Sequence, residues 1–125
     1  MAKQRPVYLN LVRIRLPLPG ILSILHRVSG ALLFLVGIPA LLAGVAWSLA
    51  SPEENDQLRA AIGHPLAKLA LVGFMWAYLH HFCAGIRYLL LDVHQGIELA
   101  PARRSSAVVI AVSLALTLIA GIRLW

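Results

Sequence analysis

Three long apolar stretches, separated by short polar connections, dominate the hydrophobic pattern of this chain. The stretches run from about residue 21 to 50, from about 65 to 93 and from about 104 to 125. Residues 28–50 carry no charged side chain. Because about 20 consecutive apolar residues suffice to cross a bilayer as a helix, each stretch predicts one membrane span. We therefore expect an all-α membrane protein with three transmembrane helices, forming a single anchor domain over residues 1–125.

The polar segments predict how the spans begin and end. Residues 1–20 are basic and contain several prolines, so we expect an interfacial arm and no cleavable signal peptide. The connection 51–64 opens with "SPEE", in which Ser51 can cap a helix and Pro52 can occupy its first position. Inside the first span, Pro39 is expected to kink the helix because it lacks a backbone donor.

The distribution of charge predicts the topology. The chain has a formal net charge of +6, and its basic side chains flank one end of the expected bundle (Lys3, Arg5, Arg13, Arg15, Arg103 and Arg104). The connection 51–64 is acidic instead. Short loops rich in Lys and Arg remain on the cytoplasmic side of a membrane. We expect a cytoplasmic (or matrix) N-terminus and an external C-terminus, and we infer no nucleic-acid partner from the positive charge.

Small side chains recur every seven residues along the first stretch, at Ser23, Gly30, Gly37 and Gly44. Seven residues are close to two helical turns, so these positions form one narrow seam where another helix can approach. We expect Arg27 to lie on this seam and to point into a helix–helix interface rather than into lipid. The third stretch carries a weaker seam (Ser113, Thr117 and Gly121). Three short helices enclose little interior, so we expect a partner chain to complete a heteromeric bundle, a homo-oligomer being the alternative.

The segment "SILHRVSG" places two polar side chains, His26 and Arg27, near the mouth of the first span. A charge at the centre of a span costs about 2.5–3.5 kcal/mol on insertion scales, and less near an end. One interpretation is that the Arg27 stem lies in the membrane while its head reaches lipid phosphate. The other is that Arg27 and His26 pair with anionic or carbonyl groups of a bound ligand, aided by the Ser23 hydroxyl one turn earlier.

A second polar cluster lies in "HHFCAGIRYLLLD", where His81, Gly85, Tyr88 and Asp92 share one helix face. If Asp92 marks the membrane boundary, His81 lies about 16 Å deep at about 1.5 Å per residue. A histidine at this depth is a functional candidate, and neutral imidazole is a common ligand of haem iron. Gly85 leaves room for a flat ring. The alternative is a neutral histidine hydrogen-bonded between helices.

Spacing limits how many of the histidines can bind one iron. His80 and His81 cannot both be axial ligands, since adjacent helical positions diverge by about 100°. His26 is expected at a depth of about 8 Å against about 16 Å for His81, which argues against both touching iron. That depth suits contacts from His26 and Arg27 to carboxylates at the edge of a porphyrin. The second axial ligand is then expected from another chain.

The motif "RPVYLNL…SILHRVSG" followed by "HxxxGIR…D" resembles the cytochrome b membrane-anchor subunit of succinate dehydrogenase, respiratory complex II. The resemblance covers nearly the whole chain and is carried by two groups of positions (Arg5, Pro6, Ser23, His26, Arg27 and Ser29 in the first, and His81, Gly85, Ile86, Arg87 and Asp92 in the second). One departure is Tyr88, which stands where the family usually has histidine or phenylalanine.

The resemblance implies a four-subunit complex in which a flavoprotein and an iron–sulfur protein are held by two membrane anchors that share one haem b. It implies that His81 is an axial ligand of the haem iron, and that His26 and Arg27 contact the haem propionates. Ser23 and Arg27 match the ubiquinone-site residues. The chain would then anchor the complex and help to bind ubiquinone, while the succinate site lies on another subunit. The implied location is the bacterial inner membrane, with the mitochondrial inner membrane as the alternative.

Two other functions stay open at this point. A fumarate reductase anchor has the same architecture and works with another quinone in the opposite direction. A non-redox membrane scaffold would use the histidines and Arg27 only to hold helices together.

Overall fold

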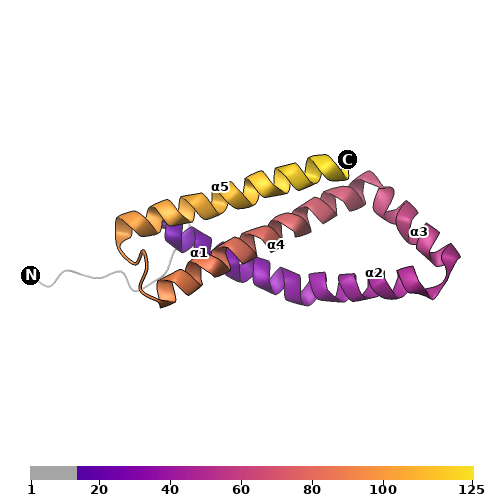
Figure 1. Ribbon diagram of the computed structural model, residues 1–125, viewed down its shortest axis with the longest axis horizontal. Helices are drawn as coiled ribbons and strands as arrows, with labels where there is room; N and C mark the ends of the chain where they lie inside the picture. The colour runs from indigo at the N-terminus through magenta and orange to yellow at the C-terminus, as the bar shows by residue number, and fades with distance from the viewer. Residues whose placement is uncertain (1–13) are drawn as a thin grey trace, which may run out of the picture.

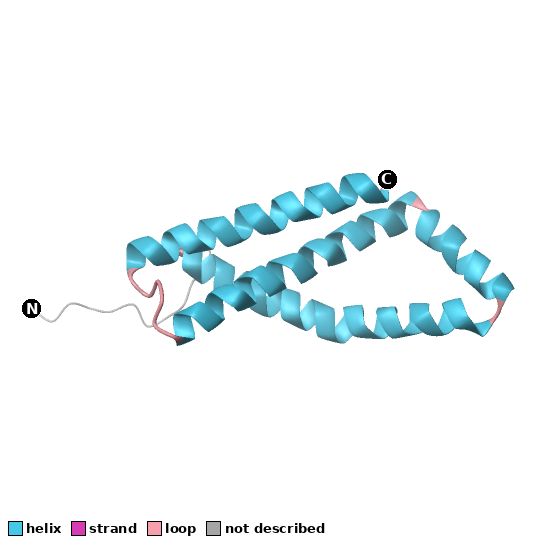
Figure 2. Cartoon of the chain, viewed as in Figure 1, coloured by secondary structure: helices cyan, strands magenta, loops and turns pink. Residues whose placement is uncertain are grey.

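The computed structural model describes residues 14–125, so most of the expected arm over residues 1–20 lies outside the described residues. Helices account for nearly all of this part of the chain, and it contains no strand (Figures 1 and 2). In chain order the elements are α1 (Leu18–Leu32), the π-helical η1 (Leu33–Gly37), α2 (Ile38–Ala50), α3 (Pro52–Gly63), α4 (Pro65–Asp92) and α5 (Leu99–Leu124).

Three of the continuous helices are long and apolar enough to cross a membrane. They run over Leu18–Ala50, which joins α1, η1 and α2, and over Pro65–Asp92 and Leu99–Leu124. The expectation of an all-α membrane protein with three spans is therefore confirmed. The first and third helices begin earlier than residues 21 and 104, because Pro19 and Pro101 lie in their first turns. A proline there sacrifices only an amide that has no partner within the helix.

The first span changes its hydrogen-bonding pattern just before Pro39. Over η1 the helix widens, and the Ile38 amide donates to the Leu33 carbonyl five residues earlier. Pro39 itself has no amide to donate, so the wider turn accommodates the irregularity that its ring imposes. Beyond this point α2 runs away from α4, and α3 spans the distance between their ends (Figure 1). Within the described residues, α2 contacts only η1 and α3.

The α3 segment begins as the "SPEE" signal predicts. Ser51 has an extended backbone and its Oγ accepts a 3.1 Å hydrogen bond from the Glu54 amide, while Pro52 is the first helical residue. Glu53 and Glu54 lie in the first turn, where carboxylates interact favourably with the helix dipole.

Small and polar side chains form the interface between α4 and α5. The buried positions recur at helical spacing on both helices (Ala77, His80, Ala84 and Arg87 on α4; Ser106, Val109, Ser113 and Thr117 on α5). A Cβ placed on Gly121 would lie 3.5 Å from Val72 Cγ2. The seam of the third stretch therefore packs against α4, as membrane helices with small interfacial residues do.

The seam of the first stretch packs against α4 only in part. A Cβ on Gly37 would lie 3.7 Å from Phe74 Cε1, and Gly30 approaches His81 even more closely, but Gly44 has no atom of another element within 4 Å. Arg27 is exposed and does not lie between the helices described in this chain, so its expected place in a helix–helix interface stays a prediction that concerns a partner chain. Three residues before Gly30, it is rotated by about 60° from the contact line.

Candidate functional site

The imidazole rings of His26 and His81 lie face to face between α1 and α4. Their centroids are 4.2 Å apart and their planes differ by 5°. The Tyr88 ring lies 5.0 Å from His26, and a Cβ on Gly85 would lie 3.8 Å from His26 Nε2. The face predicted to carry His81, Gly85 and Tyr88 is therefore the face of α4 that meets His26.

The hydrogen bonds of His81 determine which of its ring nitrogens carries the proton. Nδ1 lies 3.0 Å from the backbone carbonyl oxygen of His26 and 3.3 Å from Ser29 Oγ. A carbonyl oxygen can only accept, so Nδ1 must be the protonated nitrogen. Nε2 is then left with a lone pair. This is the arrangement in which histidine binds a metal, with its other ring nitrogen donating to a backbone carbonyl.

Gly30 makes the close approach of the two helices at His81 possible. A Cβ added to Gly30 would lie 2.7 Å from His81 Cε1 and 3.2 Å from Nδ1. Both distances are shorter than van der Waals contact, so any side chain here would displace the imidazole. The seven-residue spacing had identified Gly30 as a close-approach position, but it did not indicate that a histidine ring lies against it.

His26 and His81 were expected at different depths in the membrane, but their side-chain rings are in contact. Contacts of Gly30 with His81 and of Gly85 with His26 place the backbone of His26 opposite Gly85, about one helical turn from His81. The backbone offset is close to the expectation, but the side chains bridge it and stack. The rings meet because an imidazole extends several ångströms from its Cα, and the expectation that the two histidines do not both bind iron stays a prediction.

Ser23 and Arg27 lie on α1 next to this pair but do not join it. Ser23 is half-buried and Arg27 is exposed. They are four residues apart, so they project from neighbouring positions one turn from each other. Among the side chains predicted to form the site, the structure thus brings His26 and His81 together, whereas Ser23 is half-buried and Arg27 is exposed.

The chain matches the family described as "Succinate dehydrogenase/Fumarate reductase transmembrane subunit" over residues 1–120. It belongs to this family. A "Succinate dehydrogenase cytochrome b556 subunit" from Coxiella burnetii is 35% identical over 126 residues, covering 100% of both chains. Subunits of the same description from Rickettsia typhi and Paracoccus denitrificans are 32% and 33% identical, over 93% and 92% of this chain and 90% and 88% of their own lengths.

The resemblance to the succinate dehydrogenase cytochrome b anchor is therefore confirmed, and the chain is a multi-pass membrane anchor of this class.

In this anchor His80, the residue before His81, lies on a different face of α4 from His81. His80 is 0% exposed, and neither of its ring nitrogens has a hydrogen-bond partner within residues 14–125. Its ring centroid is 5.3 Å from that of Trp76. It shares the buried face with Arg87, seven residues later, and that face meets α5.

A contact that the sequence did not predict joins α4 and α5 of the anchor at the end of the bundle where α4 finishes. Arg87 donates from Nε to Ser105 Oγ at 2.8 Å and from Nη2 to the Ala102 carbonyl at 3.3 Å. Its Cζ lies 5.6 Å from the centroid of the Tyr88 ring. Two sequence features could have predicted this contact. Arg87 lies inside an apolar stretch, and the serine pair Ser105 and Ser106 lies early in the next span.

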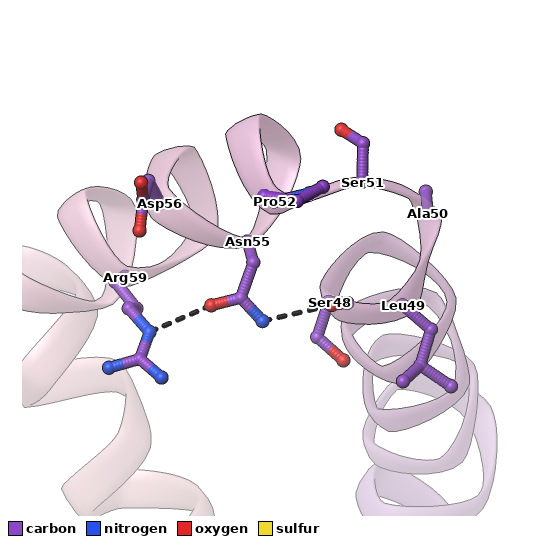
Figure 3. Close-up of a pocket in the computed structure, with 8 residues that line it drawn as sticks. All are labelled: Ser48, Leu49, Ala50, Ser51, Pro52, Asn55, Asp56 and Arg59. Carbon is purple, nitrogen blue, oxygen red and sulfur yellow. Dashed lines mark hydrogen bonds between the residues drawn. The ribbon is translucent and has the colours of Figure 1, made fainter.

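An open pocket lies at the corner between α2 and α3 of the anchor and contains neither His26 nor His81 (Figure 3). There Asn55 Nδ2 donates to the Ser48 carbonyl at 2.9 Å, and Arg59 Nε donates to Asn55 Oδ1 at 2.7 Å. The side chains satisfy a terminal carbonyl of α2 and bring a cation to the negative end of its dipole. This corner stabilises the turn and we assign it no ligand.

Proposed function

We propose that this chain is the haem b-binding membrane anchor of a succinate dehydrogenase and that it forms part of the site where ubiquinone is reduced. The observation that carries the proposal is the 3.0 Å contact between His81 Nδ1 and the His26 carbonyl oxygen, since a proton on Nδ1 would leave Nε2 available to an iron atom. The name cytochrome b556 of the relatives agrees with a b-type haem. When bound, the haem supplies one-electron transfer.

Among the residues of this chain, His81 would hold such a haem as one ligand of its iron. His81 offers a single prepared nitrogen, and no cluster of three or more metal-ligating side chains occurs among the residues that the structure describes. His26 is unsuited to be the second ligand, because its ring already contacts that of His81 and no porphyrin fits between them. The other iron ligand would then come from the second membrane-anchor subunit.

His26 and Arg27 are the residues of this chain proposed to contact the haem propionates. His26 lies directly beside the His81 ring, and Arg27 follows it in sequence with an exposed guanidinium. A guanidinium binds a carboxylate through two parallel hydrogen bonds, so Arg27 suits a propionate at the membrane rim. Its exposure on the isolated chain leaves it available to a group bound between this chain and its partner.

Ser23 and Arg27 are the proposed ubiquinone-binding residues. Their spacing of one turn presents a hydroxyl and a cation together at the end of α1 nearer the polar surface. The hydroxyl can donate to one carbonyl oxygen of the quinone, and the guanidinium can orient the head group and favour negative charge that develops on it. The exposed apolar side chains of the first span provide a wall for the isoprenoid tail.

The complex proposed around this chain contains a flavoprotein, which holds the succinate site, an iron–sulfur subunit and a second small anchor. We place it in the bacterial inner membrane with the N-terminus in the cytoplasm. The beginning of α1 and the α4–α5 connection lie at one end of the bundle, and α3 and the C-terminus lie at the other (Figure 1). Lys and Arg are more numerous in the segments at the first end (Lys3, Arg5, Arg13, Arg15, Arg103 and Arg104) than at the second (Arg59, Lys68 and Arg123), and this excess supports the orientation under the positive-inside rule.

The haem assignment is tested by purifying the complex with His81→Ala and recording its reduced-minus-oxidised spectrum. We expect the b-type band to be lost while the subunits still copurify. An intact band in this variant would overturn the assignment. Complete absence of haem from the unmodified complex would favour the non-redox scaffold instead.

The quinone assignment is tested with Arg27→Ala. Succinate-dependent reduction of ubiquinone is expected to fall at least 10-fold, while reduction of a soluble dye by succinate persists. Equal loss of both activities would contradict a role at the quinone. Comparing succinate oxidation with fumarate reduction in the same preparation distinguishes this function from that of a fumarate reductase anchor.

A further inference from the structure

The geometry points to a further function for the α1 turn from His26 to Gly30: it selects which nitrogen of His81 faces the haem and fixes the plane of that ring. Ser29 and Gly30 are then positioning residues, although neither would touch the iron. This inference rests on the proposed function, since it concerns how His81 is prepared for its ligand.

The polar contacts of the turn are compatible with a single tautomer of His81. Ser29 Oγ donates a 3.0 Å hydrogen bond to the His26 carbonyl, so its one hydrogen is already used. Its lone pairs and the same carbonyl both face His81 Nδ1, at 3.3 Å and 3.0 Å. The N–H of Nδ1 is thus shared between two acceptors. The other tautomer would set an unprotonated Nδ1 against the carbonyl lone pairs and lose the bond.

Apolar contacts of the same turn constrain the ring plane. The Cβ-less backbone of Gly30 lies beside the Cε1–Nδ1 edge of His81, where a Cβ would approach to 2.7 Å. The parallel His26 ring covers one face at a centroid distance of 4.2 Å. A half-turn of the imidazole would exchange Nδ1 for a carbon and leave the partly buried His26 carbonyl without this donor. Contacts on one edge and one face therefore hold the ring. A Cβ on Gly30 would also lie 3.6 Å from Nε2, so the lack of a side chain keeps space beside the nitrogen proposed to face the haem.

Gly30→Ala in the whole purified complex tests the steric part of the inference, with Gly44→Ala as the matched control. Both changes add one methyl group to the same helical span, but a Cβ on Gly44 meets no atom within 4 Å. We expect Gly30→Ala to speed the transfer of haem to excess apomyoglobin about 10- to 100-fold, the usual cost of disturbing an outer-shell partner of a metal ligand. Gly44→Ala is expected to match the unmodified complex.

Ser29→Ala tests the polar part and remains informative if Gly30→Ala does not assemble, since it only removes an oxygen. Its control is Ser113→Ala, because Ser113 is buried and donates to the carbonyl three residues earlier at the same 3.0 Å. We expect Ser29→Ala to retain haem but to change the g-values or broaden the lines of its low-spin ferric electron paramagnetic resonance spectrum. Ser113→Ala is expected to leave that spectrum unchanged.

Two results separate failure of this inference from failure of the proposed function. If Gly30→Ala and Ser29→Ala both behave as their controls do while His81→Ala loses the haem, the α1 turn does not position the ligand and the inference is overturned. If His81→Ala retains an unchanged haem spectrum, His81 is not the ligand and the proposed function fails first.

Discussion

Arg87 on α4 donates a 2.8 Å hydrogen bond from Nε to Oγ of Ser105 on α5, and the arginine is only 5% exposed. A buried guanidinium needs such partners, because an ion removed from water without them is costly. The bond, together with the one to the Ala102 carbonyl, fixes the last turns of α4 against the first turns of α5.

Removing the Arg87 side chain should therefore weaken the hairpin of α4 and α5. We expect Arg87→Ala to lower the free energy of unfolding by about 1.5–3 kcal/mol, the range for hydrogen bonds that involve a charged group. Arg87→Lys should recover only part of this, since an ammonium cannot reproduce the planar two-point donation. Thermal unfolding of the detergent-solubilised complex measures the effect. The control is Arg103→Ala, which removes an exposed arginine of α5; equal melting of Arg87→Ala and Arg103→Ala would contradict the prediction.

The two adjacent histidines should respond oppositely to the same substitution. His80→Phe replaces a fully buried ring, whose nitrogens have no partner within residues 14–125, with an apolar ring of similar shape. We expect the complex to keep its haem and to be unchanged or stabilised, by up to about 1–3 kcal/mol. His81→Phe should lose the haem band. Loss of haem in His80→Phe with retention in His81→Phe would reverse the assignment of the two residues.

Leucines of α1 and α2 should differ in their contribution to stability. Leu22 is 0% exposed and belongs to the small core shared with Ala84 and Val109, whereas Leu41 is 67% exposed on α2. Leu22→Ala is expected to cost about 2–5 kcal/mol through lost contacts and a cavity. Leu41→Ala should stay within about 0.5 kcal/mol if lipid covers it. A large loss for Leu41→Ala, measured by thermal unfolding of the complex, would show instead that another subunit packs there.

The cap of α3 provides a local test of the connection between the first two spans. Ser51→Ala removes the acceptor of the Glu54 amide and should cost about 1 kcal/mol, confined to α3. Faster hydrogen exchange of amides in the first turn of α3 is the expected observation. Ser48→Ala serves as the control, because Ser48 Oγ donates only to the Val45 carbonyl of its own helix. Equal exchange in the two variants would contradict the cap.

Much of this architecture follows from residue patterns that act locally. Uncharged stretches of sufficient length predict the three spans, and the "SPEE" segment predicts the start of α3, because capping depends on a few neighbouring residues. The shared face of His81, Gly85 and Tyr88 follows from helical periodicity alone. The same periodicity identified Gly30 and Gly37 as positions of close approach between helices.

Features that depend on how the helices meet were not predictable in this way. The contact between His26 and His81 depends on the register of α1 against α4 and on side-chain rotamers, and a depth estimate captures neither. The Arg87 hydrogen bonds depend on the register of α4 against α5. Arg27 was expected between helices. It lies three positions before Gly30, so it is rotated by about 60° from the line of contact with α4. This rotation leaves its side chain exposed within this chain.

The irregular turn at Leu33–Gly37 divides the first span into two surfaces that can change independently. The part of the span before the turn, α1, packs against His81 of α4 and tolerates little variation. Beyond the turn, α2 contacts only η1 and α3 among the described residues. Inserting or deleting one residue at the turn would rotate everything after it by about 100° without moving α1. Neighbouring subunits could thus be accommodated along α2 by altering its orientation, without disturbing the end of the helix that packs against His81.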